Sequence, residues 1–272
     1  MRAAIVAEYR KLVTTRTWWV LLLVAFGYLA FLGAVLAWAL AQPNATTDAG
    51  GDGSQSITLT ATQIVSSIYT IGVSLGFAFP VIVGVLVVTT EYRHKTLTPT
   101  LLAEPSRTRM IAAKLVIGAG EGVLFGLATT CAATAAGAAV LALLHQPTAL
   151  GVGATWGMLG RSVLALAVWA VIGVAIGTVI TNQVAAIVVV LAFTQFLEPA
   201  LRTVFAVTSW GAGVGKFLPG AAGEAIAGGS FYSAAGIGQI LGQWWQGLLV
   251  LLAYAAVLVV AGRLTTLRRD VA

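Results

Sequence analysis

The chain has 272 residues, of which 59% are hydrophobic and only 9% are charged. Soluble domains carry about 25% charged residues, so this composition excludes a soluble domain with an ordinary surface. The net charge of +6 comes from basic residues at the ends of apolar runs, a pattern that indicates membrane topology and not nucleic-acid binding. Apolar runs longer than the roughly 20 residues that cross a bilayer as a helix predict an all-α polytopic membrane protein.

The first predicted element is an amphipathic helix within residues 1–17. Its apolar residues recur at helical spacing, at Ile5, Val6, Tyr9, Leu12 and Val13. Most of the charged residues fall elsewhere on this helix, which is typical of a segment that lies in the membrane surface. The alternative is a plain basic flank of the first span.

Six hydrophobic stretches are then predicted to span the bilayer as helices, within a single transmembrane domain over 1–272. These stretches are 18–41, 61–90, 111–144, 156–180, 184–206 and 244–262. The second and third exceed the usual length, so we expect tilt or an extension into water. Residues 207–243 contain ten glycines and hardly any charge. Short helices that dip into the outer leaflet fit this composition best.

The distribution of Lys and Arg predicts the orientation of the spans. Basic residues are frequent in the N-terminal segment, in residues 89–114 and in the C-terminal tail, which lie on one side when six spans are counted. Residues 42–60, on the other side, contain Asp48 and Asp52 and no basic residue. We therefore expect a multi-pass protein of the cell inner (plasma) membrane with both termini in the cytoplasm.

Motifs for enzymatic chemistry are missing from the sequence. It has no H-E-x-x-H and no G-x-S-x-G, and the Gly-rich stretch 211–217 lacks the first Gly and the Ser/Thr of a phosphate-binding loop. Cys131 is the only cysteine, and the two histidines lie far apart. We expect no catalytic residue, metal or cofactor on this chain.

Few charged residues fall inside the predicted spans. Glu121 lies seven residues beyond Lys114 and so roughly 10 Å into the third span. Such a carboxylate either faces a pathway or bonds a neighbouring helix. Glu198 and Arg202 are four residues apart, which predicts an ion pair along one helix. Close helix contacts are permitted by small-residue spacings at Gly72/Gly76, Gly118/Gly122/Gly126 and Gly173/Gly177.

Several segments together resemble the permease subunits of type-2 ATP-binding-cassette exporters. They are "AEYRKLVTTRTWW" at 7–19, "EYRHKTL" at 91–97, "PSRTRMIAAKL" at 105–115, "GVAIGTVITNQVAA" at 173–186 and "LPGAAGEAIAG" at 218–228. Each motif is loose, but their order, spacing and topology match along essentially the whole chain.

The resemblance implies a half-transporter that pairs with a second copy or a homologous permease and with two separate cassette ATPase subunits. ATP and Mg²⁺ would be bound by those partners and not by this chain. Residues 1–17 resemble the family's elbow helix, 207–243 its outer re-entrant helices and 91–110 its cytoplasmic coupling helix. The residues implied to contact the ATPase are Glu91, Tyr92, Arg93, His94, Lys95, Leu97, Leu101 and Leu102.

The resemblance also places the second and fifth spans at the dimer axis. Aromatic and polar residues there would meet an amphipathic drug, peptide or lipid-like substrate, namely Phe77, Phe79, Phe193, Gln195 and Phe196. Ordinary core or lipid-facing packing is the alternative for these five. Two other functions stay open: a stand-alone carrier or channel, and a membrane sensor or immunity partner that transports nothing.

Overall fold

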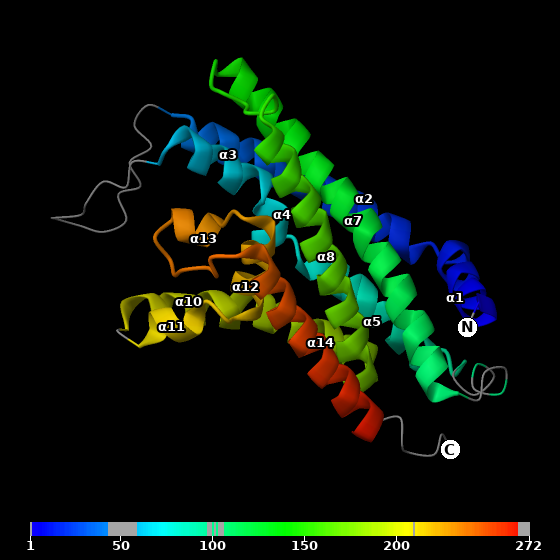
Figure 1. The fold of residues 1–272 in the computed structure, drawn as a ribbon. Coiled ribbons are helices and arrows are strands. Elements are labelled where there is room, and N and C mark those ends of the chain that lie inside the picture. Colours follow the sequence, from blue (N-terminus) through cyan, green and yellow to red (C-terminus); the bar gives the residue numbers. More distant parts are fainter. Residues whose placement is uncertain are drawn as a thin grey trace.

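The computed structural model describes residues 2–42, 59–96, 100, 102, 106–208 and 210–265. Every regular element in these ranges is a helix (Figure 1). The helices are α1 (Arg2–Thr14), α2 (Thr17–Leu40), α3 (Ala61–Tyr69), α4 (Ile71–Ser74), α5 (Ala78–Arg93), α7 (Arg107–Leu143), α8 (Gly153–Val179), α9 (Gln183–Ala192), η1 (Phe193–Leu197), α10 (Glu198–Val207), α11 (Gly211–Gly215), α12 (Pro219–Ala227), α13 (Phe231–Ala234) and α14 (Trp244–Thr265).

Five helices are long and apolar enough to cross a membrane. They are α2, α7, α8, the run of α9, η1 and α10, and α14. The all-helical fold predicted from the sequence is therefore confirmed, and five such helices are compatible with a multi-pass membrane protein. The prediction of six spans is not confirmed, because the second stretch, 61–90, does not form one helix.

This second stretch is divided into α3, α4 and α5, with turns at Thr70 and at 75–77. Pro80 explains the second break, since it has no N–H to donate to Gly76 and is tolerated only in the first turn of a helix. The helix restarts just before it, with Phe79 N–H bonded to the Gly76 carbonyl (3.1 Å). The 16 residues of α5 measure about 24 Å, less than the roughly 30 Å hydrocarbon core.

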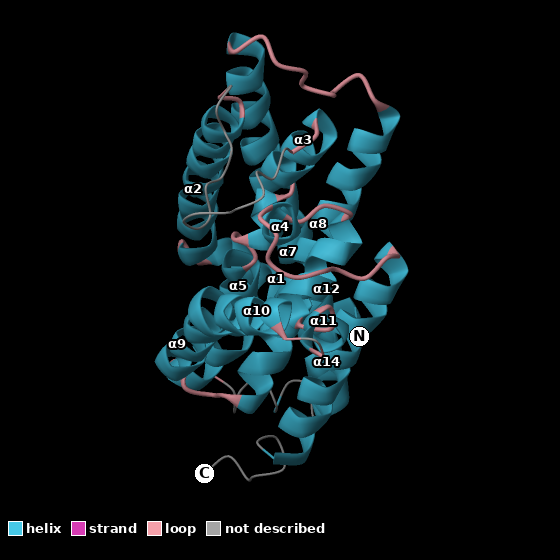
Figure 2. Cartoon of the chain, turned by 90° about the vertical axis from the view of Figure 1, so that its left-hand side faces the viewer, coloured by secondary structure: helices cyan, strands magenta, loops and turns pink. Residues whose placement is uncertain are grey.

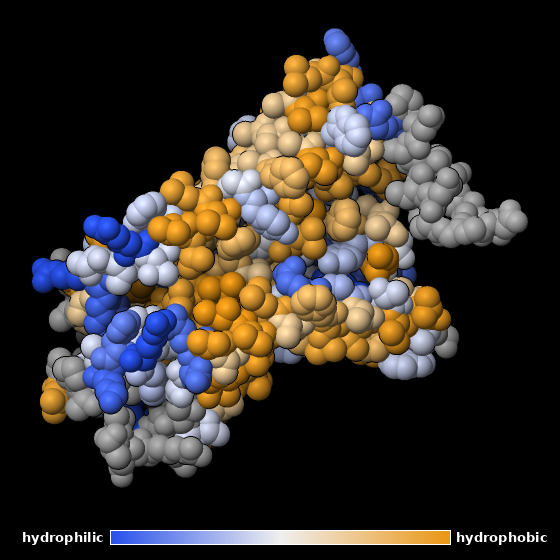
Figure 3. All heavy atoms as spheres, turned by 180° about the vertical axis from the view of Figure 1, so that it is seen from behind, coloured by the Kyte–Doolittle hydropathy of each residue, from blue (hydrophilic) through white to orange (hydrophobic). Residues whose placement is uncertain are grey.

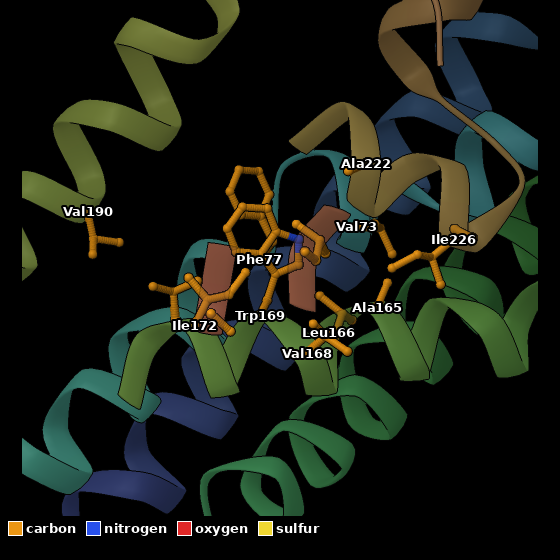
Figure 4. Close-up of a cluster of buried hydrophobic side chains, with 14 of the residues drawn as sticks. Val73, Phe77, Ala165, Leu166, Val168, Trp169, Ile172, Val190, Ala222 and Ile226 are labelled. Atoms are coloured by element: carbon orange, nitrogen blue, oxygen red, sulfur yellow. The ribbon is translucent and has the colours of Figure 1, made fainter. Parts of the chain in front are cut away.

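Helix α8 lies at the centre of the bundle and packs against α5, α7, α12 and α14, while α2 lies along α7 (Figures 1 and 2). Apolar side chains from α4, α5, α8, α9, α12 and α14 form a core around it. Within this core the rings of Phe77 and Trp169 stack with centroids 4.4 Å apart (Figure 4). Aromatic stacking of this kind adds about 0.5–1.5 kcal/mol to the burial of the rings.

The molecular surface separates apolar and polar side chains. Large apolar side chains are exposed along α2, α9 and α14, among them Phe31, Val188 and Val257. Hydrophilic side chains gather mainly at one end of the bundle (Figure 3). We call it the basic end. It contains α1, the last turn of α5, the first turns of α7 and the last turn of α14. A broad apolar surface of this kind marks contact with lipid or with another protein.

The predicted small-residue contacts are present where α7 and α5 approach α8. A Cβ at Gly122 of α7 would lie 2.7 Å from the Ala167 Cα of α8. A Cβ at Gly173 of α8 would lie 2.1 Å from the Val81 carbonyl oxygen of α5. Both neighbours are backbone atoms that no rotamer change can move. Glycine is therefore required for these two close helix contacts.

We expect Gly173→Ala to destabilise the bundle by about 1–3 kcal/mol, because the added methyl forces α5 and α8 apart. The matched control is Gly157→Ala on the same helix, where no atom lies within 4 Å of the added Cβ. That control should be neutral or slightly stabilising, since Ala is the better helix former. Thermal unfolding in detergent measures both, and equal stability of the two variants would contradict the tight α5–α8 contact.

Candidate functional site

Four charged side chains from three helices form one network at the basic end. Glu8 and Lys11 come from α1, Glu91 from the last turn of α5 and Lys114 from α7. The Lys114 ammonium lies 2.9 Å from Glu8 Oε2 and 3.0 Å from Glu91 Oε2, and it also donates to the Val87 carbonyl. Lys11 is 2.8 Å from Glu8 Oε1 and pairs with Glu91 Oε1. We call this set the inner ion network.

Three members of the inner ion network are almost inaccessible to solvent: Glu8, Glu91 and Lys114 are 6%, 4% and 1% exposed. Two carboxylates and two ammonium groups cancel in charge, which is what makes their burial tolerable. Burial alone lowers the pKa of Lys11, but its hydrogen bonds with Glu8 and Glu91 outweigh that effect and raise the pKa above 10.5. Lys11 is therefore charged at neutral pH, and the network is complete.

Helix α1 is oriented with two of its charged residues inward, while Arg10 is exposed. Glu8 and Lys11 face α5 and α7, while Val6, Tyr9 and Val13 are exposed. A helix on a soluble protein would bury the apolar residues instead. Val6, Tyr9 and Val13 thus form an exposed apolar stripe on α1.

The predicted docking residues fall into three groups. Arg93, His94 and Lys95 are exposed, and so is Leu102, at 79%. Leu97 and Leu101 lie outside the described residues. Glu91 and Tyr92 point into the chain: Glu91 belongs to the inner ion network, and Tyr92 packs against Met110 and Ile111. Residues 91–93 continue α5 and residues 107–110 begin α7, with Ser106 capping α7 at Arg109 N–H.

A cavity of about 460 Å³ lies beside the inner ion network, between α1, α2, α5 and α7. Its wall includes Glu8, Lys11 and Glu91 at one end and Glu121 further along α7. The exposed residues Arg93 and His94 lie at the rim with Thr96, while Leu86 and Ile117 contribute apolar wall. The cavity therefore combines a polar mouth with apolar side chains further in.

A second buried cluster, the outer ion cluster, joins α10 to α12. Arg202 lies 3.1 Å from Glu198 Oε1, as the four-residue spacing predicts, and 2.7 Å from Glu224 Oε2. Glu198 also accepts from Gly220 N–H in the first turn of α12, and Ser230 donates to Glu224 at 2.6 Å. The guanidinium stands 4.6 Å from the centre of the Tyr232 ring.

The outer ion cluster holds two carboxylates and one guanidinium, all at most 5% exposed. Two acidic side chains therefore share one buried cation. Glu198 Oε2 and Glu224 Oε1 lack a hydrogen-bond partner among the described residues. Among the described residues, Arg202 is the cation that pairs with both carboxylates.

The five predicted pathway residues do not meet in one site. Phe77 is 3% exposed and belongs to the core, and Phe79 faces the ring of Tyr28 at 5.7 Å. Phe193, Gln195 and Phe196 lie on η1, where Phe196 is 75% exposed. None of the five lines either the 460 Å³ cavity or the smaller space beside Arg202.

Sequence reasoning missed Glu8, Lys114 and Glu224 as members of buried clusters. The contacts that join different helices are distant in the sequence, up to 106 residues for Lys114 and Glu8, although Glu8 also pairs locally with Lys11. The one available signal was that each is a charged residue beside or within an apolar stretch, where an unpaired charge is costly. Comparison with protein-family models finds no match, and comparison with curated proteins finds none either.

Proposed function

We propose that the chain is the permease subunit of an ATP-driven exporter of the type-2 ATP-binding-cassette class. It would act as a dimer with two separate ATPase subunits that bind ATP and Mg²⁺. The observation that carries this proposal is the inner ion network beside the exposed residues 93–96. It fastens α1 to the end of α5 and the start of α7, so a push on the polar segment between α5 and α7 is passed to three helices at once.

The N-terminal helix supports the elbow-helix prediction. An elbow helix must hold the protein with one face and the membrane surface with the other. The inward Glu8 and Lys11 of α1 bind the rest of the protein. The exposed Val6, Tyr9 and Val13 are suited to contact with the membrane surface. In this proposal both termini and the basic end are cytoplasmic, and α3, α4 and α5 together take the place of the missing continuous span.

The exposed part of 91–110 supports docking onto a soluble motor. Arg93, His94 and Lys95 offer charged contacts. Leu102 offers an apolar side chain whose exposure to water is unfavourable. Exposed apolar side chains at a polar surface are typical of interaction sites when other apolar residues accompany them. In this revised assignment Glu91 and Tyr92 do not touch the ATPase but hold the segment in position.

The outer short helices support the re-entrant prediction. Helices α11, α12 and α13 are 5, 9 and 4 residues long, too short to span a bilayer. Gly220 to Ala227 of α12 are all buried, and the outer ion cluster fixes them to α10. Irregular backbone at membrane depth is tolerated when protein surrounds it in this way.

The experiment is co-purification with the cassette ATPase that accompanies the chain, followed by ATP hydrolysis in proteoliposomes. The double variant Lys95→Glu/Leu102→Asp should lose the ATPase partner and its coupled hydrolysis, because it reverses a charge and places another in an apolar contact. Its thermal unfolding should match the wild type, since both side chains are exposed. The matched control is Leu143→Asp at the opposite end, also an exposed leucine.

Normal complex formation and coupled hydrolysis in the Lys95→Glu/Leu102→Asp variant would refute docking through this segment. Substrate movement by the purified chain without any ATPase would favour the stand-alone carrier or channel. A chain that binds an ATPase but moves nothing would favour the sensor or immunity partner. Complex formation, coupled hydrolysis and substrate movement, measured with and without the ATPase, thus separate the three functions.

A further inference from the structure

Glu121 is a buried carboxylate for which the described part of the chain provides no partner. It is 7% exposed, and its Oε2 atom is buried without a hydrogen bond. No ion pair reaches it from any described residue, in contrast to Glu8 and Glu91 on the same cavity wall. A buried acid in a membrane helix is costly unless something pairs with it, so the missing partner calls for a ligand.

The carboxylate lines the 460 Å³ cavity at the end away from the inner ion network. Lys114 and Glu121 are seven residues apart on α7, so Glu121 lies roughly 10 Å deeper. The wall between them is apolar and includes Leu21, Leu86 and Ile117. The volume lies within the roughly 300–1,000 Å³ that is typical of small-molecule sites, and the lining combines these apolar side chains with polar ones such as Thr17 and Thr90.

Trp18 of α2 adds a second recognition element to the same wall. It is half-buried and is the one Phe, Tyr or Trp side chain among the described residues that line this cavity. Trp is the aromatic side chain that attracts cations most strongly through its ring face. A carboxylate and an indole around an apolar space match the chemistry of a hydrophobic amine or quaternary ammonium.

We propose that this cavity binds a hydrophobic organic monocation, with Glu121 as its counter-ion and Trp18 as an aromatic wall. This inference stands on the cavity alone and holds whether or not the chain works with an ATPase. A metal ion does not fit, because a single carboxylate is too few ligands and no cluster of three acidic, His or Cys side chains occurs in the described ranges.

The charges at the mouth set the selectivity that we expect. Glu8, Lys11 and Glu91 neutralise one another together with Lys114, so the mouth presents mainly Arg93 as an unbalanced cation. This single positive charge discourages small hydrated cations. A cation with a large apolar body gains burial on the apolar wall that offsets the repulsion.

The test is equilibrium binding of radiolabelled tetraphenylphosphonium to the chain in lipid nanodiscs without any ATPase. Wild type should bind saturably, and the uncharged triphenylphosphine oxide should compete at least tenfold more weakly than unlabelled cation. Glu121→Gln keeps the shape but removes the charge and should weaken binding at least tenfold. Glu121→Asp keeps the charge and should retain most of the affinity. Trp18→Leu should weaken binding about threefold or more.

A matched pair of variants tests the location of the site. Leu86→Trp fills the cavity and should abolish saturable binding. Leu124→Trp makes the same change on a 40% exposed position of α7 outside the cavity wall and should leave binding unchanged. Equal effects of both substitutions would place the binding elsewhere and overturn the proposal.

Two further outcomes would also overturn it: Glu121→Gln that binds as tightly as wild type, or triphenylphosphine oxide that competes as strongly as the cation. If Glu121→Gln fails to fold, a protection experiment on the wild-type chain still tests the proposal. A hydrophobic carbodiimide should modify Glu121, and saturating tetraphenylphosphonium should slow that modification at least tenfold in peptide maps. An unchanged rate in the presence of the cation contradicts an ion pair at Glu121.

Discussion

Replacing Lys114 by Met is expected to lower the free energy of unfolding by about 3–5 kcal/mol, because it leaves two buried carboxylates without their shared cation. Glu8 and Glu91 are only 6% and 4% exposed, so hydration compensates for little of the lost ammonium. Lys11 remains on their other side but is partly exposed, with 42% of its side chain accessible. The loss should also release α1, which trypsin would report as faster cleavage after Arg10.

The control is Lys95→Met, which removes the same charge at the same end from an exposed position. It should change stability by less than about 0.5 kcal/mol. The double variant Lys114→Met/Glu91→Gln restores neutrality and should recover part of the lost stability, a coupling that a double-mutant cycle measures. If Lys114→Met unfolds at the same temperature as Lys95→Met and resists trypsin equally, the inner ion network does not hold α1.

Replacing Arg202 by Leu is expected to be as damaging, at about 3–5 kcal/mol, because both Glu198 and Glu224 then carry unpaired buried charge. The cost depends on whether the substitution removes the positive or a negative charge. Glu224→Gln leaves one carboxylate for one guanidinium, so it should cost much less than Arg202→Leu. Thermal unfolding measures the difference between the two variants.

The triple variant Arg202→Leu/Glu198→Gln/Glu224→Gln tests whether Arg202 stabilises the fold through its charge or through its packing. Removing all three charges should recover much of the stability that Arg202→Leu loses, because neutral amides are far cheaper to bury than carboxylates. A triple variant as unstable as Arg202→Leu would mean that Arg202 acts through its packing against Tyr232 instead.

The local part of this architecture was predictable from the sequence. Five helices long enough to span a membrane follow from apolar runs, and the Glu198–Arg202 pair follows from four-residue spacing. Pro80 indicated the break in the second stretch. The prediction of one continuous span over 61–90 followed the average hydropathy of the stretch and not this proline. The π turn η1 had a similar signal: Pro199 lacks an N–H, and just before it Glu198 N–H donates to Phe193, five residues back.

The long-range part was not predictable, and the reason is physical. Glu8 and Lys11 sit among basic residues near a membrane surface, so charge pattern alone places them in water. Only folding brings α5 and α7 against them and reverses that expectation. Similarly, Glu224 lies in a Gly-rich stretch whose nearest cation, Lys216, is eight residues away. Arg202 reaches Glu224 only through the packing of α10 on α12.

The inner ion network also imposes an order on biosynthesis. Glu8 emerges from the ribosome 106 residues before Lys114. At roughly 5–20 residues per second, α1 waits about 5–20 s for its last partner. During that interval Glu8 has a local companion in Lys11, three residues away, so its carboxylate is paired before any membrane helix has packed. The first helix to be translated therefore cannot complete its ion pairs until the second turn of α7, where Lys114 lies, has been made.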